Sequence, residues 1–158
     1  MNNAHSSFVG TDGTWVEVLK PPQQNSSARP ALFLDRDGTI VEEVLYLHRP
    51  EEMALIPGAA DTIIAANTKN IPVIIVTNQA GIGRGYYGWD DFIAVQACMM
   101  EELNDLGAQI DAVFACPFHV NGKGPFIHPD HPDRKPNAGM LLQAAAKLQI
   151  DLTRSWLA

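Results

Sequence analysis

The sequence predicts an α/β fold in which a parallel β-sheet is flanked by helices. Short apolar runs of strand length recur at residues 31–34, 71–76 and 112–115, and segments with helically spaced apolar residues separate them at 59–69 and 89–106. Buried strands that alternate with helices are typical of βαβ units with a parallel sheet. Polar side chains directly follow the first two strands, at the sheet edge where α/β folds bind ligands.

Composition limits the class of protein. The chain has 158 residues, 46% of them hydrophobic, which fits one domain with a sizeable core. Its net charge of −7 argues against a nucleic-acid partner or a membrane surface. No apolar run approaches membrane-spanning length, and residues 1–7 lack a signal-peptide core. Two cysteines, Cys98 and Cys116, make no disulfide framework, so we expect a cytoplasmic protein.

The segment before the first apolar run is expected to be an extension. Residues 1–13 are polar and contain glycine, which predicts a loose terminus. Residues 14–19 alternate weakly and predict an edge strand, and residues 21–30 (PPQQNSSARP) have the composition of a linker. We therefore expect an N-terminal extension and linker over residues 1–29, and one domain over 30–158.

Two carboxylates, Asp35 and Asp37, follow the first strand in a turn that contains glycine. Like charges at this spacing raise each other's pKa, and a bound cation relieves the repulsion. One carboxylate could attack a substrate while the other handles a proton, with Mg²⁺ screening both. A calcium loop is excluded, because its sixth and twelfth positions would hold Ile40 and Tyr46 in place of glycine and glutamate. Simple capping of a turn stays an alternative.

The second strand ends in Thr77, Asn78 and Gln79, and the glycine-rich segment AGIGRG follows at residues 80–85. Side-chain donors and accessible backbone N–H groups at this position predict an oxyanion cradle, to which Arg84 adds a guanidinium. The alternative is an ordinary glycine-rich turn with Arg84 on the surface. Upstream, residues 40–50 are expected to be irregular and residues 53–56 to form a short strand before the helix at 59–69.

The later segments supply core and a long loop. In the helix at 89–106 the apolar stripe is more simply core than a cofactor site, with Cys98 a packed thiol beside it. Residues 116–136 form a long loop with three histidines, five prolines and the basic pair Arg134 and Lys135, and loops of this length are commonly functional. Asn137 is expected to cap a helix over 138–149, and a fourth strand begins within 154–158.

DRDGT at 35–39, TNQAGIGRG at 77–85 and RKP at 134–136, in this order, resemble the motifs of the haloacid dehalogenase (HAD) superfamily. The resemblance is to its branch of histidinol-phosphate and D-glycero-D-manno-heptose 1,7-bisphosphate phosphatases. It implies a Rossmann-like HAD fold without a large cap domain. It also implies Mg²⁺-dependent hydrolysis of a phosphorylated small molecule, a heptose bisphosphate of carbohydrate metabolism, through an aspartyl phosphate.

The resemblance also implies roles for individual residues. Asp35 would be the nucleophile and Asp37 the acid and base, and both would hold the metal, Asp35 through its carboxylate and Asp37 through its backbone carbonyl. Thr77 and Lys135 would bind the transferring phosphoryl group. The substrate would be bound by Asn78, Gln79, Arg84, Arg134, Glu43 and Tyr46.

The heptose enzymes often carry a structural zinc in the long loop, held by Cys-x-His and Cys-x-Cys pairs. Because the matching positions include Phe118 and Asp133, which are unsuitable or weak zinc ligands, we expect no zinc. An alternative ligand set with tolerable spacing is Cys116, His119, His128 and His131.

Superfamily members place a further acidic motif, Gly-Asp, just after the strand that begins within residues 154–158, and this sequence stops before it. We therefore expect a truncated piece of a longer enzyme, with the C-terminal part of the domain missing. An inactive phosphate-binding module, a histidinol-phosphate phosphatase and a polynucleotide 3′-phosphatase remain alternatives, the last disfavoured by the acidic composition. The substrate anomer and the oligomeric state do not follow from the sequence.

Overall fold

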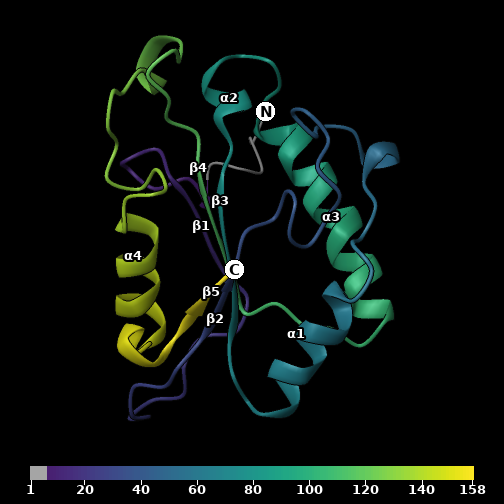
Figure 1. The fold of residues 1–158 in the computed structure, drawn as a ribbon. Coiled ribbons are helices and arrows are strands. Elements are labelled where there is room, and N and C mark those ends of the chain that lie inside the picture. The colour runs from purple at the N-terminus through teal and green to yellow at the C-terminus, as the bar shows by residue number, and fades with distance from the viewer. Residues whose placement is uncertain (1–6) are drawn as a thin grey trace.

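The structure is a computed structural model that describes residues 7–158, and a five-stranded sheet forms its centre (Figure 1). The strands, in sheet order, are β1 (Trp15–Val18), β4 (Ala112–Cys116), β3 (Val73–Asn78), β2 (Leu32–Leu34) and β5 (Trp156–Leu157). Strands β4, β3, β2 and β5 pair in parallel, as the sequence predicts, and β1 pairs antiparallel with β4 at one edge.

Helices cover both faces of the sheet (Figure 1). On one face lie α1 (Ala59–Thr68) and α3 (Trp89–Asp105), and on the other lies α4 (Gly139–Leu148). The single turn α2 (Ala80–Gly83) follows β3 directly. The described part of the chain also contains the short 3-10 helices η2 (Pro50–Glu52), η3 (Gly124–Phe126) and η4 (Leu152–Arg154).

The strands separate two hydrophobic clusters because successive side chains point to opposite faces. Leu34 and Ile75 pack with Ile63 of α1 and with the α3 stripe around Phe92. Phe33 and its neighbours on the other face pack against α4. Packing on both faces of the sheet fixes the ends of its strands, and the residues that directly follow β2 and β3 are positioned by these ends.

Two expectations about local structure are wrong. Residues 53–56 form no strand, because only Leu55 makes a single bridge, to Val41. A loose terminus is expected over residues 1–13. Residues 1–6 lie outside the described residues, and for residues 7–13 the expectation is wrong. There Val9 bridges Trp15, and the Phe8 ring lies 5.0 Å from the Trp15 ring.

The expected cap on α4 is also wrong. The helix begins at Gly139, and no side chain caps it. Asn137 instead donates from Nδ2 to Asp130 Oδ1 at 2.6 Å and to the backbone oxygen of His131 at 3.0 Å. Asn137 therefore joins two residues of the preceding loop and does not cap α4.

Among the residues that the structure describes, no helix combines the length and the hydropathy needed to cross a membrane.

Candidate active site

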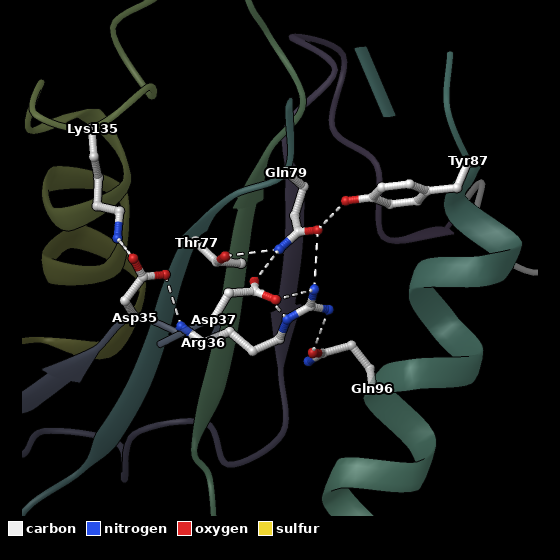
Figure 2. Close-up of polar contacts among 8 residues, drawn as sticks. All are labelled: Asp35, Arg36, Asp37, Thr77, Gln79, Tyr87, Gln96 and Lys135. Carbon is white, nitrogen blue, oxygen red and sulfur yellow. Dashed lines mark hydrogen bonds and ion pairs between the residues drawn. The ribbon is translucent and has the colours of Figure 1, made fainter. Parts of the chain in front are cut away.

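The carboxyl ends of β2 and β3 lie side by side, and the residues that follow them share one edge of the sheet (Figure 2). The parallel register pairs Leu34 with Ile75, so Asp35 and Thr77 come from neighbouring strands. The loop after β4 returns to the same edge and places Lys135 beside Asp35 (Figure 2). Three segments far apart in the sequence thus meet where open α/β sheets bind ligands.

Asp35 and Lys135 form an ion pair, with 2.6 Å between Nζ and Oδ2. The other carboxylate oxygen, Oδ1, accepts a hydrogen bond from the backbone N–H of Arg36 at 2.7 Å. Both side chains keep contact with solvent, 22% exposed for Lys135 and 35% for Asp35. A partly exposed pair contributes little to stability, so its importance lies in where it places a carboxylate and an ammonium group.

Asn78 holds the main chain of Lys135. Its Nδ2 donates to the Lys135 carbonyl oxygen at 3.1 Å, and its Oδ1 accepts from the Lys135 N–H at 3.0 Å. The sequence suggests Asn78 as a substrate ligand, whereas the structure uses both ends of its amide to fix the peptide of Lys135.

Asp37 faces a buried arginine. Arg36 donates from Nε to Asp37 Oδ2 and from Nη2 to Asp37 Oδ1, both at 3.0 Å (Figure 2). Gln79 Nε2 adds a third hydrogen bond, to Oδ2 at 2.9 Å. The carboxylate is therefore held in one plane by two neighbours.

Gln79 joins this carboxylate to Thr77. Its Nε2 also donates to Thr77 Oγ1 at 2.9 Å, while its Oε1 accepts from Arg36 Nη2 at 3.2 Å and from the Tyr87 hydroxyl at 2.6 Å. Burial raises the pKa of Tyr87, and the Arg36 guanidinium offsets part of this rise, so the hydroxyl stays a donor at neutral pH. The Gln79 amide, which the sequence suggests as a substrate ligand, is thus occupied by protein groups.

A cavity of about 190 Å³ opens beside Asp37, with Glu43 and Tyr46 in its lining. Arg84 donates from Nη1 to the Tyr46 hydroxyl at 2.8 Å, and its guanidinium lies 5.0 Å from the Tyr86 ring centre. Arg84 therefore lies beside the aromatic pair Tyr46 and Tyr86, whose ring centres are 4.7 Å apart. A larger cavity, about 620 Å³, lies at the opposite edge of the sheet and includes none of the predicted site residues.

Arg134 reaches back over its own loop. Its Nη1 donates to the carbonyl oxygen of Phe118 at 3.1 Å. The residue is adjacent to Lys135, and its charge, like that of Arg84, helps to lower the pKa of His119, which burial lowers most. Both arginines therefore add positive charge near His119.

The glycine-rich segment serves packing. A Cβ at Gly81 would lie 2.1 Å from the Tyr87 ring, and one at Gly83 would lie 2.0 Å from the Pro117 carbonyl oxygen. The N–H groups of Ile82, Arg84 and Gly85 donate to carbonyl oxygens within the same turn. The expected cradle of free N–H groups is therefore wrong for these three residues, because a helical turn uses them.

Magnesium suits the oxygen atoms at this edge. The Asp35 carboxylate is partly open to solvent, and among residues 7–158 no donor is recorded for the Asp37 carbonyl oxygen. Mg²⁺ prefers oxygen ligands and keeps several waters, so one carboxylate and one carbonyl fit it. Residues 7–158 contain no group of three or more histidine, cysteine or acidic side chains arranged to hold a metal.

The alternative zinc ligands do not gather into such a group. Nδ1 of His119, His128 and His131 each accepts a backbone N–H from two residues further along. The His131 ring stacks on Phe118 with 3.8 Å between ring centres, and burial raises the pKa of the Cys116 thiol to about 11. These side chains have packing roles in the described chain, and the absence of zinc stays a prediction.

Sequence reasoning missed Arg36, Tyr87 and Gln96. Arg36 is 1% exposed and Gln96 is 6% exposed, so both belong to the interior. Gln96 had a signal: it lies on the apolar stripe of α3, four residues after Phe92, where a polar side chain calls for a buried partner. Arg36 carried no comparable signal, because the burial of this cation beside Asp37 is visible only in the structure.

Solved structures define the class of this fold and site. A HAD-like phosphatase from Mesorhizobium loti superposes with a TM-score of 0.88 at 45% identity, over 95% of this chain and 71% of that one. A D,D-heptose 1,7-bisphosphate phosphatase from B. bronchiseptica, complexed with magnesium and phosphate, superposes with a TM-score of 0.67 at 28% identity, over 77% and 65%. The chain has the HAD-like phosphatase fold, as its three motifs suggest.

Sequence relatives narrow the class. A D-glycero-β-D-manno-heptose-1,7-bisphosphate 7-phosphatase from Mesorhizobium japonicum is 47% identical over 147 residues, which are 90% of this chain and 65% of that protein. The protein of the same name from Rhodopseudomonas palustris is 41% identical over 128 residues, 81% of this chain and 71% of its own length. No family model matches the sequence. The chain belongs to the D-glycero-D-manno-heptose-1,7-bisphosphate 7-phosphatase family and spans about two thirds of the length of these relatives.

Proposed function

We propose that this chain carries the site of a Mg²⁺-dependent phosphatase that hydrolyses a sugar phosphate monoester, D-glycero-D-manno-heptose 1,7-bisphosphate, through an aspartyl phosphate. The observation that carries the proposal is the 2.6 Å contact between Asp35 and Lys135 at the carboxyl edge of the sheet. The names of the relatives support the substrate, and the magnesium and phosphate of the B. bronchiseptica structure support the metal.

In the first step an Asp35 carboxylate oxygen attacks phosphorus in line with the sugar oxygen that leaves. The O–P bond to the sugar breaks, and the proton that its oxygen needs comes from the Asp37 carboxyl group. The Lys135 ammonium group lies 2.6 Å from Asp35 Oδ2, so it also reaches an oxygen of a phosphoryl group bound there. Phosphoryl transfer depends mainly on such positioning and charge.

Thr77 is prepared to donate to the same group. Because its Oγ1 already accepts from Gln79 Nε2, its own hydroxyl hydrogen remains for a phosphoryl oxygen. When bound at the Asp35 carboxylate and the Asp37 carbonyl, Mg²⁺ supplies positive charge that offsets the carboxylates and the phosphate.

In the second step water attacks the phosphorus of the aspartyl phosphate. Asp37, now a carboxylate, takes a proton from this water, inorganic phosphate leaves, and the Asp35 carboxylate is restored. Asp37 thus acts as an acid in the first step, and because that step leaves it as a carboxylate, it acts as a base in the second.

The test is phosphate release from heptose 1,7-bisphosphate, with and without Mg²⁺, by the product of the full open reading frame that encodes this chain. Asp35→Asn should abolish turnover, because an amide cannot form the acyl phosphate. Asp61→Asn, at an exposed position of α1, is the matched control and should keep full activity. The Asp35→Asn protein must melt like the wild type for the comparison to count.

Parallel assays with histidinol phosphate and a 3′-phosphorylated oligonucleotide test the substrate. A larger kcat/KM for either one contradicts the heptose assignment. Substrate binding without turnover by the wild-type protein would instead support a phosphate-binding module.

A further inference from the structure

A buried arginine contacts the acid–base carboxylate of the site. Arg36 lies between Asp35 and Asp37 in the sequence, yet its side chain turns into the interior beneath α3 and is 1% exposed. A buried guanidinium is costly unless its donors are paired. The hydrogen-bond partners of the Arg36 guanidinium therefore indicate which groups the fold holds in place around it.

Arg36 holds Asp37 with a two-pronged contact, Nε to Oδ2 and Nη2 to Oδ1, both at 3.0 Å (Figure 2). Paired, parallel hydrogen bonds of this kind fix the plane of a carboxylate as well as its distance. A lysine at this position would supply the charge without the geometry.

The Arg36 guanidinium is itself held in place by contacts other than those with Asp37. Nη2 also donates to Gln79 Oε1 at 3.2 Å, Nη1 donates to Gln96 Oε1 at 3.4 Å, and the Phe92 ring lies 5.4 Å away. Gln96 Nε2 has no partner among the described residues although the residue is 94% buried. Leaving a buried amide hydrogen unpaired is unfavourable. Gln96 nevertheless has the conformation in which its oxygen accepts from the Arg36 guanidinium.

This arrangement leaves the two oxygens of Asp37 unequal. Among the described residues, Oδ2 accepts two hydrogen bonds, from Arg36 and Gln79, whereas Oδ1 accepts one. A carboxylate oxygen has two lone-pair directions. Oδ1 therefore keeps one direction open for a proton, and Asp37 lines the cavity beside it.

We propose that Arg36, held by Gln79 and Gln96, is the positioning residue that orients Asp37 so that Oδ1 exchanges the proton with the leaving alcohol and with water. This inference rests on the proposed function, because it assigns a geometry to its acid–base group. Arg36 does not touch the substrate, and it acts through Asp37.

The test separates orientation of Asp37 from general damage by varying the leaving group. Hydrolysis of an alkyl phosphate needs a proton donor in the first step, whereas p-nitrophenyl phosphate has a leaving group stable enough to depart without one. Both substrates need the base for hydrolysis of the aspartyl phosphate. A displaced Asp37 should thus slow both steps for the alkyl ester and mainly the second step for the aryl ester.

The experiment compares Arg36→Met, Arg36→Lys and the wild type, each as the full open reading frame, with both substrates. For Arg36→Met we expect kcat on the alkyl ester to fall about 100-fold with KM within about threefold, the size of effect that misplacement by about 1 Å produces. With p-nitrophenyl phosphate we expect a burst approaching one nitrophenolate per protein, followed by slow turnover. Arg49→Met is the matched control, since the Arg49 side chain is 58% exposed and pairs with Glu52 at 3.9 Å.

Arg36→Lys covers the case in which Arg36→Met does not fold, and it should show the same burst because an ammonium group cannot reproduce the paired contact. Wild-type rates for Arg36→Lys on both substrates would overturn the inference, as would equal losses on both substrates without a burst. Wild-type protein with no Asp35-dependent phosphate release would instead contradict the proposed function. The two failures are therefore distinct.

Discussion

Replacing Asp133 by alanine should loosen the loop that carries Lys135. Asp133 is 5% exposed, and its Oδ2 accepts from Thr14 Oγ1 at 2.7 Å and from Gln143 Nε2 at 2.9 Å. One carboxylate thus connects the start of β1, the long loop and α4. Arg134 and Lys135 follow it directly in the chain.

The expected cost follows from the groups left behind. Thr14 is 0% exposed, so its hydroxyl would lose the acceptor Asp133 Oδ2 in a dry environment, at a cost of about 1–3 kcal/mol. The Gln143 amide is less buried and can form a hydrogen bond with water instead, so its loss of Asp133 adds less to the free-energy cost. Removing a buried charge returns part of this cost, so we expect a net loss of about 2 kcal/mol and a fall in Tm of about 4–8 °C.

The assay is urea unfolding together with steady-state phosphate release. Asp133→Asn keeps an acceptor oxygen and should lose about half as much stability. Asp130→Ala is the matched control, since its carboxylate lies in the same loop but is exposed and accepts from Asn137. If Asp133→Ala unfolds at the same urea concentration as Asp130→Ala, the reasoning about the buried carboxylate is refuted.

Three further predictions concern the site and its neighbours. Lys135→Met should lower kcat by about 100- to 1,000-fold with little change in Tm, measured by phosphate release and thermal unfolding, and a Tm drop as large as that of Asp133→Ala would contradict it. Tyr46→Phe removes the oxygen that accepts from Arg84 Nη1 at 2.8 Å, so steady-state kinetics should show a several-fold rise in KM at constant kcat. Burial raises the pKa of Cys116 from 9.0 to about 11, so the folded state keeps a proton that the unfolded chain releases. The stability that this thiol contributes is complete below pH 9 and is lost as pH rises toward 11. When the pH is raised from below 9 to 10, the free energy of unfolding measured in urea should fall by about 1 kcal/mol more for the wild type than for Cys116→Ala.

Much of the scaffold was predictable because it depends on local pattern. The apolar runs at 31–34, 71–76 and 112–115 each overlap a strand of the structure, and the stripe of α3 is buried as its spacing indicates. These signals depend only on which residues avoid water, and a single chain displays them directly. The short segment 53–56 has the same composition, but no neighbouring strand is placed to pair with it.

The arrangement of side chains at the site was predictable only in part. The approach of Lys135 to Asp35 was expected from the resemblance to the HAD superfamily, and the two side chains lie 2.6 Å apart in the structure. The partners of Asn78 and Gln79 did not follow, because amides bind equally well to a substrate, a peptide group or another side chain. The contacts of Asn78 with Lys135 and of Gln79 with Asp37 depend on distances between segments about 40 or more residues apart, on which sequence spacing carries no information.

The hydrogen bonds between Asn78 and the peptide of Lys135 have a consequence for protein engineering. They hold position 135 through main-chain atoms, which every amino acid except proline presents in the same way. The position of the main chain at residue 135 therefore does not depend on these hydrogen bonds reaching any particular side chain. A library of side chains could be installed at this position on an unchanged scaffold, to recognise anions of other shapes beside the same aspartate.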